Sequence, residues 1–166
     1  MAKKREYKKW SQQQYTHAAI WAIIAYTMLG FGDKAVEYLR MINPIEHSRT
    51  KEAAIKYKVE PYVIAADIYG AENLKGRGGW TWYTGSSSWF CKAGLENILG
   101  LKVEKGILKI DPCISSKWTE YSIRYRYKTN IYNIQVKNPN GKCTGENQTF
   151  YLNRKRNKRK TNKARR

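Results

Sequence analysis

The sequence THAAIWAIIAYTML, residues 16–29, predicts a helix that is apolar on almost every side. Thr16 can cap its first turn, and Gly30 suits its C-terminal end. Such a helix belongs inside a larger all-helical body, because a small domain would leave part of it exposed to water. The apolar run is too short to span a bilayer, and no secretory signal peptide follows Met1. We therefore expect a cytoplasmic protein without a transmembrane segment.

Helical signals extend from about Gln14 to Gly100. The main interruptions are Asn43-Pro44 and the Gly-rich loop GAENLKGRGG, residues 70–79. Pro is tolerated in the first turn of a helix, so Glu60-Pro61 predicts a helix start. The expected helices cover residues 16–29, 34–42, 51–56, 60–69 and 89–99, the last capped by Ser86–Ser88 and closed by Gly100.

After Gly100 the period of the apolar residues changes from about 3.6 toward 2, which indicates strands. In the strand WTEYSIRYRY, residues 118–127, alternation places Tyr121 and Ile123 on the same face. The turn NPNG covers residues 138–141. The further strands are expected over residues 107–110, 130–136 and 149–152. The expected organisation is a basic extension over 1–13, a helical segment over 14–100, a β segment over 101–152 and a disordered basic tail over 153–166.

The formal charge of +19 is concentrated at the two ends of the 166-residue chain. Residues 1–10 carry +4 and residues 153–166 carry +9, which leaves +6 for everything between them. Blocks of like charge are typical of solvated, disordered tails, and they can also tether a chain to nucleic acid or to another anionic surface. Both interpretations of the ends stay open.

The three cysteines, Cys91, Cys113 and Cys143, are widely spaced, and no CxxC pair or Cys/His cluster is present. This pattern argues against a structural metal site. An odd number also argues against a disulfide framework. A Cys113–Cys143 bridge is an alternative in an oxidising compartment, but three reduced and mostly buried thiols are the simpler expectation.

The segment GRGGWTWYTGSSSW, residues 76–89, places Gly, aromatic and hydroxyl side chains just before a helix start. The first N–H groups of a helix have no partner inside it and attract anions. Gly85 would permit close approach of an anion, and Thr84 offers a hydroxyl. The same residues also fit a capped helix that follows a loop with core aromatics. The flat side chains on which a sugar ring or a base could pack are Trp80, Trp82 and Tyr83.

Three further polar residues have two interpretations each. His17 opens the apolar helix, either as an anion ligand or proton-transfer group or as a histidine satisfied by a backbone carbonyl. Glu60 and Asp67 would share a face of a continuous helix. They would lie about 10 Å apart, which is wide for an acid–base pair. We therefore interpret Glu60 as a helix-start carboxylate and Asp67 as structural or substrate-ordering.

Five motifs follow one another along the chain: QYTHAAIWA (14–22), INPIEHSRT (42–50), VEPYVIAADIY (59–69), residues 76–89, and LGL (99–101) with IDPCI (110–114). Their order resembles the C-terminal end of glycoside hydrolase family 94. The resemblance is strongest to the phosphorylase-like domain of cyclic β-1,2-glucan synthases and to 1,2-β-oligoglucan phosphorylases, with cellobiose and chitobiose phosphorylases as more distant relatives.

This resemblance implies a mainly α then β fold, in which the last helices of an (α/α)6 barrel precede a small antiparallel β-sandwich-like segment. It implies cleavage of a β-glucosidic bond by inorganic phosphate with inversion, releasing α-glucose 1-phosphate. The partners would be a β-glucan oligosaccharide and phosphate as co-substrate, with no other cofactor. By its motifs, His17, Thr84 and Gly85 bind phosphate, and Trp82 belongs to the wall of the substrate pocket.

The sequence also departs from the family pattern. Ser87-Ser88 replaces small residues, often Ala-Gly, and Ala66 stands where cellobiose phosphorylases present a Gln to the sugar, which fits another linkage such as β-1,2. The general-acid Asp of the family lies upstream of anything in this chain, so no catalytic residue is assigned here. We therefore expect a fragment or subunit of the enzyme, completed by an upstream companion chain and without phosphorolytic activity alone.

Two alternatives belong to other functional classes. A basic nucleic-acid-binding protein would use the tail and a surface made by Tyr125 and Tyr127 beside Arg124 and Arg126. A non-catalytic carbohydrate-binding protein would use the aromatic residues of segment 76–89 and would bind sugar independently of phosphate.

Overall fold

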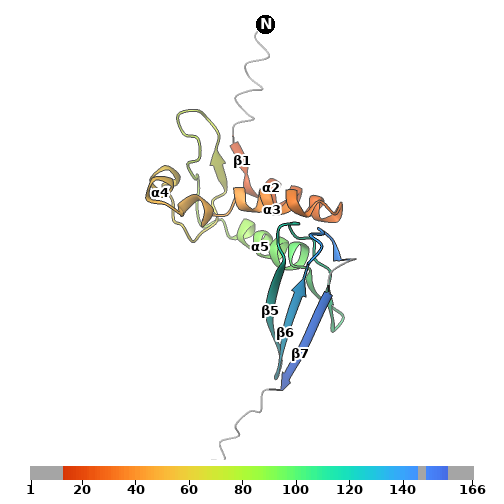
Figure 1. The fold of residues 1–166 in the computed structure, drawn as a ribbon. Helices are drawn as coiled ribbons and strands as arrows, with labels where there is room; N and C mark the ends of the chain where they lie inside the picture. The colour runs from red at the N-terminus through yellow and green to blue at the C-terminus, as the bar shows by residue number, and fades with distance from the viewer. Residues whose placement is uncertain (1–12, 146–148, 157–166) are drawn as a thin grey trace, which may run out of the picture.

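The computed structural model describes residues 13–145 and 149–156, and it shows a helical part followed by antiparallel strands (Figure 1). The expected order of mainly α then β is confirmed, whereas the (α/α)6 barrel would be a larger assembly than these residues form and stays a prediction. The helical part consists of β1 (Gln13–Tyr15), α2 (Thr16–Met28), α3 (Gly32–Met41), η1 (Glu46–Ser48), α4 (Lys51–Tyr57), β2 (Asp67–Tyr69), α5 (Thr84–Lys92) and the π-helical segment η2 (Ala93–Ile98).

Helix α2 is the centre of the main core. It packs against α3, α5 and η2, and its Ile20 and Ile23 are fully buried. Gly32 allows the start of α3 to approach the β part, because a Cβ at this position would collide with the carbonyl of Ile114. The buried members of this core are Ile20, Ile23, Ala35, Val36, Ile42, Ala93, Ile98 and Ile114.

The other side of α2 is uncovered. Trp21 is 55% exposed and Met28 is 80% exposed, and Leu29 just after the helix is also exposed. The helix is therefore as apolar as the sequence predicted, but only one of its sides is covered within the part of the chain that the structure describes. None of the helices in this part is long and apolar enough to cross a membrane.

The helix expected over residues 60–69 is wrong. The segment begins with a turn at residues 61–62, and its last three residues form β2, which pairs antiparallel with β1. Ala66 accepts a hydrogen bond from the N–H of Thr16 at 2.8 Å and donates its own N–H to Trp80 at 2.6 Å. These partners lie far away in the sequence, so tertiary hydrogen bonds override a local helix signal. Consequently Glu60 and Asp67 do not share a helix face.

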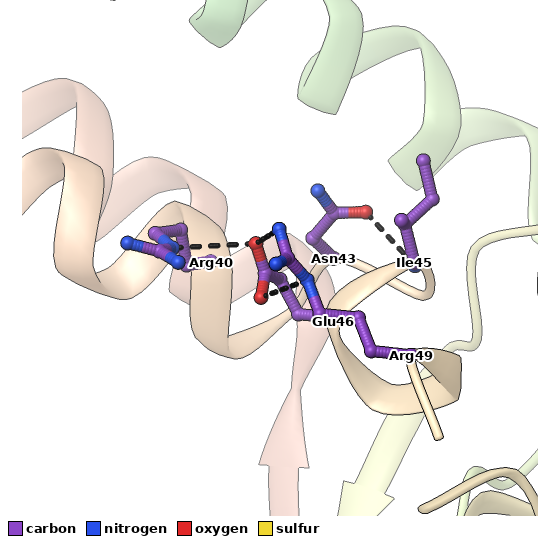
Figure 2. A network of polar contacts seen from close by, with 5 residues as sticks. All are labelled: Arg40, Asn43, Ile45, Glu46 and Arg49. Atoms are coloured by element: carbon purple, nitrogen blue, oxygen red, sulfur yellow. Dashed lines mark hydrogen bonds and ion pairs between the residues drawn. The ribbon is translucent and has the colours of Figure 1, made fainter. Parts of the chain in front are cut away.

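The connection between α3 and α4 is fixed by an ion-pair network (Figure 2). Both carboxylate oxygens of Glu46 contact Arg49, at 2.8 and 2.9 Å, and one of them also contacts Arg40 at 3.3 Å. Asn43 accepts the N–H of Ile45 through its side chain. Helix α4 then begins where predicted, with Thr50 as the cap that accepts the N–H of Ala53.

Helix α4 supports a second, smaller core beneath the Gly-rich loop. Tyr57 is 1% exposed and packs with Ala65 and Ile68. The loop can cross this core only because it has glycines at positions 78 and 79. A Cβ on Gly78 would collide with Val59, and a Cβ on Gly79 would collide with the carboxylate of Asp67. Asp67 therefore has a structural position beside the loop.

The β part begins after Gly100, as expected, and consists of a hairpin and a separate three-stranded sheet. The sheet has the antiparallel order β5-β6-β7, and Tyr121 pairs with Val136 while Ile123 pairs with Ile134. The predicted alternation is confirmed: Tyr121 and Ile123 lie on the half-buried face of β5. The strands are β3 (Leu101–Glu104), β4 (Ile107–Ile110), β5 (Glu120–Tyr127), β6 (Asn130–Lys137) and β7 (Thr149–Arg156).

Strand β7 continues to Arg156, four residues beyond the expected end of the last strand at Leu152, and so includes the first residues of the predicted basic tail. The rest of the tail, residues 157–166, and the basic extension over residues 1–12 lie outside the described residues. The three cysteines are free thiols, with Cys113 buried but Cys91 exposed. Burial raises the pKa of the Cys113 thiol to about 11, which makes it unreactive.

Candidate functional site

His17 lies in the first turn of α2 and faces the start of α5. Its Nδ1 is 2.7 Å from the hydroxyl of Ser86, a fully buried residue of α5. The imidazole stacks on Tyr15 at 5.7 Å between ring centroids, and Tyr83 contacts it edge-on at 5.2 Å. When Ser86 donates to Nδ1, the ring proton is on Nε2, which can then donate to an anion.

Helix α5 begins at Thr84, five residues before the predicted start at Trp89. Ser86, Ser87 and Ser88 are therefore helical residues and not caps. Tyr83 precedes the helix and provides no side-chain cap, and its carbonyl accepts the N–H of Ser87 at 3.0 Å. The N–H groups of residues 84–86 come before this first helical bond and have no partner among the described residues.

Gly85 brings these free N–H groups close to the histidine. A Cβ on Gly85 would lie 3.4 Å from both Cε1 and Nε2 of His17, so the glycine leaves open the space beside the ring. The starts of α2 and α5 thus meet at one place, and neither has an acidic residue in its first turn. Two helix N-termini without acidic residues in their first turns give this place a positive potential.

The structure thus brings together His17, Thr84 and Gly85, the three residues for which the sequence predicted phosphate binding. Sequence reasoning missed Ser86 and Tyr83 as parts of this place. The sequence placed Ser86 at the helix start, as a cap or beside an anion, but no local pattern shows that its hydroxyl lies against a ring 69 residues earlier.

Trp82 lies just before this helix start, at the end of the Gly-rich segment. Its side chain is 61% exposed, and its Nε1 donates to Oε1 of Glu60 at 3.2 Å. Its ring meets Tyr62 edge-on at a centroid distance of 6.2 Å. Trp80 is 77% exposed, whereas Tyr83 turns toward His17. The predicted aromatic group is thus divided: Tyr83 packs on His17, whereas Trp82 packs against Tyr62.

Other features of the described residues lie apart from this place. A hollow of about 450 Å³ is lined by Lys56, Lys58, Lys75 and Arg77, and one of about 390 Å³ by Thr27, Asp111 and Cys113 among others. Neither hollow is lined by His17 or Thr84. Within residues 13–145 and 149–156, no three His, Cys, Asp or Glu side chains gather in a way that could hold a metal ion.

Comparison with known proteins finds a glucan synthase and phosphorylases as relatives. The chain is 46% identical over 123 residues to the cyclic β-(1,2)-glucan synthase NdvB of Rhizobium meliloti, an alignment that covers 74% of this chain and 4% of that protein. It is 33% identical over 132 residues to the N,N'-diacetylchitobiose phosphorylase of Vibrio furnissii, covering 79% and 16%. It is 27% identical over 138 residues to the solabiose phosphorylase of Paenibacillus borealis, covering 79% and 17%.

The chain thus spans less than a fifth of the length of these relatives. Residues 5–100 match the family model described as the catalytic domain of the glycosyl hydrolase 94 superfamily. This range includes α2, the loop segment with Trp82 and the start of α5, which are the elements that build the candidate site. The chain belongs to the glycosyl hydrolase 94 superfamily.

Proposed function

We propose that this chain supplies the phosphate-binding segment of a β-glucan phosphorylase or cyclic β-1,2-glucan synthase. The observation that carries this proposal is the meeting of His17 with the free N–H groups at the start of α5. Nε2 of His17, the hydroxyl of Thr84 and the N–H groups of Thr84 and Gly85 would bind the phosphate oxygens. An anion there gains charge-assisted hydrogen bonds and the favourable potential of two helix N-termini.

In the proposed reaction, phosphate attacks the anomeric carbon of a β-glucoside and the leaving oxygen takes a proton from a carboxylic acid. The bound phosphate would be held in line with the bond that breaks, and the histidine and backbone N–H groups would donate hydrogen bonds to its oxygens. No residue of this chain is assigned the role of the acid. The chain alone is therefore proposed to bind phosphate but not to cleave a glucan.

The proposed substrate is a β-1,2-linked glucan. The 46% identity to a cyclic β-(1,2)-glucan synthase supports this choice. So does Ala66, which offers no amide to a sugar at the position where cellobiose phosphorylases present a Gln. Trp82 would form part of the wall of the sugar site, because its exposed ring lies two residues before Thr84.

A companion polypeptide is part of the proposal. The exposed side of α2, with Trp21 and Met28, is an apolar surface on a helix that the family resemblance places in a barrel. Burial of such surface against further helices would stabilise the fold by roughly 25 cal/mol per Å². An upstream segment of the catalytic domain is the partner that we propose for this surface.

The test is a chimeric enzyme. Residues 14–100 replace the aligned segment of the Vibrio furnissii phosphorylase, and the phosphate dependence of the phosphorolysis of N,N'-diacetylchitobiose is measured. We expect an active chimera in which His17→Ala raises KM for phosphate about tenfold or more, since a charge-assisted hydrogen bond is lost. Ser88→Ala, an exposed change on the same helix, is the control and should leave KM unchanged. An active chimera whose KM is unaffected by His17→Ala would contradict the proposal.

The nucleic-acid alternative involves tyrosines and arginines that the structure places on opposite faces of β5. Along β5, Tyr125 lies on the half-buried face, whereas Arg124 and Arg126 are exposed on the opposite face. The tail residues 157–166, which this alternative also uses, lie outside the described residues, so nucleic-acid binding stays a prediction. No second function is proposed from the strands.

A further inference from the structure

The Glu60 carboxylate holds Trp82 but takes no part in the proposed phosphate site. Its Oε1 accepts the indole N–H of Trp82 at 3.2 Å. The backbone N–H of Glu60 itself and the Thr81 side chain also donate to this carboxylate, and these bonds lower its pKa below the usual range. Glu60 is therefore ionised at neutral pH, and its charge strengthens the bond to the indole.

The backbone of Trp82 is in a conformation that bulky residues rarely adopt. Its φ is +59°, in the left-handed region that favours glycine. The backbone is held two residues before Trp82 and one residue after it: the carbonyl of Trp80 accepts the N–H of Ala66, and Tyr83 donates its N–H to Ile64. A conformation of this kind persists only where the surroundings determine it, and such residues gather at binding sites.

Tyr62 also contacts the indole ring of Trp82. It meets Trp82 edge-on, with an angle of 74° between the ring planes, and it is 73% exposed while Trp82 is 61% exposed. Two large aromatic side chains are thus held in a defined geometry with much of their surface in water. A flat apolar surface beside a carboxylate fits a pyranose ring, whose C–H groups pack on aromatic rings while its hydroxyls bind polar groups.

We propose that Glu60 is a positioning residue that, with Tyr62, fixes the Trp82 indole as the packing surface for a pyranose ring next to the phosphate site. This inference rests on the proposed function, because it takes the sugar of that reaction as the ligand. It replaces the helix-start role that the sequence suggested for Glu60. The sugar would contact Trp82 and Tyr62, and Glu60 would act through Trp82.

The test uses the intact chain labelled with ¹⁵N and a β-1,2-linked glucose disaccharide as the probe. The chain has six tryptophans, and Trp82→Phe identifies the indole N–H resonance of Trp82. In the wild type we expect this resonance to shift as the pH falls through the lowered pKa of Glu60, and to shift again when the disaccharide is added. In Glu60→Gln, which keeps an acceptor oxygen, the acid-induced shift should disappear while disaccharide affinity stays within about threefold.

Glu60→Ala removes the acceptor and should weaken disaccharide binding by about tenfold without changing the affinity for inorganic phosphate. Unchanged disaccharide affinity in Glu60→Ala, or an acid-induced indole shift that persists in Glu60→Gln, would overturn the positioning role. If the wild type binds phosphate but not the disaccharide, the sugar subsite is wrong and the phosphate role stands. If it binds the disaccharide but His17→Ala leaves phosphate affinity unchanged, the phosphate role is wrong and the subsite stands.

Discussion

The hydroxyl of Ser86 lies 2.7 Å from Nδ1 of His17, although 69 residues separate them in the sequence. This bond orients the imidazole, and when the hydroxyl donates to Nδ1 it leaves the ring proton on Nε2. It also joins α5 to α2 at the place where both helices begin. The histidine that we propose to bind phosphate is thus oriented by the same helix that offers the free N–H groups.

Ser86→Ala should weaken phosphate binding although Ser86 itself does not contact the phosphate. The ring would lose the partner that orients it, and we expect affinity to fall by about fivefold to tenfold, the equivalent of about 1–1.4 kcal/mol. Titration calorimetry with inorganic phosphate measures this change. Ser87→Ala, one residue further along the exposed side of α5, is the matched control. Equal losses in both variants would show that the hydroxyl of Ser86 has no specific role.

Gly85→Ala should make the fold more stable and weaken phosphate binding. The new Cβ would lie 3.4 Å from the ring of His17, a contact that the fold tolerates, and it would fill the space beside Nε2. Since Ala is favoured over Gly in helices, we expect the free energy of unfolding to rise by about 0.5–1 kcal/mol while phosphate affinity falls. Urea unfolding and phosphate titration of the same protein check both parts. A variant that is more stable and binds phosphate normally would place the anion elsewhere.

The sequence predicted the elements whose signals are local. The apolar run of α2, the Thr50 cap of α4 and the alternation in β5 all follow from residues within a few positions of one another. The segment 60–69 could not be predicted in this way, because the partners of its backbone are Thr16, Trp80 and Tyr83. The same limit applies to the candidate site. A family motif indicated His17 and Thr84, but the contacts of Ser86 and Glu60 join segments that only the fold brings together.

Gly32→Ala should destabilise the junction between the helical and β parts. Its Cβ would collide with the carbonyl of Ile114, a backbone atom that cannot move aside easily, and we expect a loss of about 1–3 kcal/mol. Gly94 in η2 is the control, since nothing lies within 4 Å of a Cβ there. Gly94→Ala should be neutral or slightly stabilising in the same thermal unfolding experiment. Equal stability of the two variants would show that α3 and residue 114 are not packed as described.

Asp33 should make the stability of this junction dependent on pH. It accepts hydrogen bonds from the Ser115 hydroxyl at 2.6 Å and from the N–H and hydroxyl of Ser116, and these bonds lower the pKa of Asp33 below its usual value of 3.8. Its contribution is therefore complete above that value and is lost as the pH falls through the lowered pKa. Because Asp33 is exposed, we expect Asp33→Asn to cost only about 1 kcal/mol at neutral pH.

Urea unfolding of the wild type and of Asp33→Asn at neutral and at acidic pH checks this prediction. The difference in the free energy of unfolding between the two proteins should shrink as Asp33 becomes protonated in the wild type. A difference that stays constant down to the acid limit would mean that the charge of Asp33 does not support the junction.

Phosphate binding by His17 is tested most directly by a calorimetric titration of the intact 166-residue chain with inorganic phosphate. The titration is made for the wild type, His17→Ala and Ser88→Ala. We expect saturable binding of one phosphate by the wild type and by Ser88→Ala, and affinity reduced about tenfold or more in His17→Ala. Equal phosphate affinity in all three proteins, or no saturable binding by a folded wild type, would contradict this expectation.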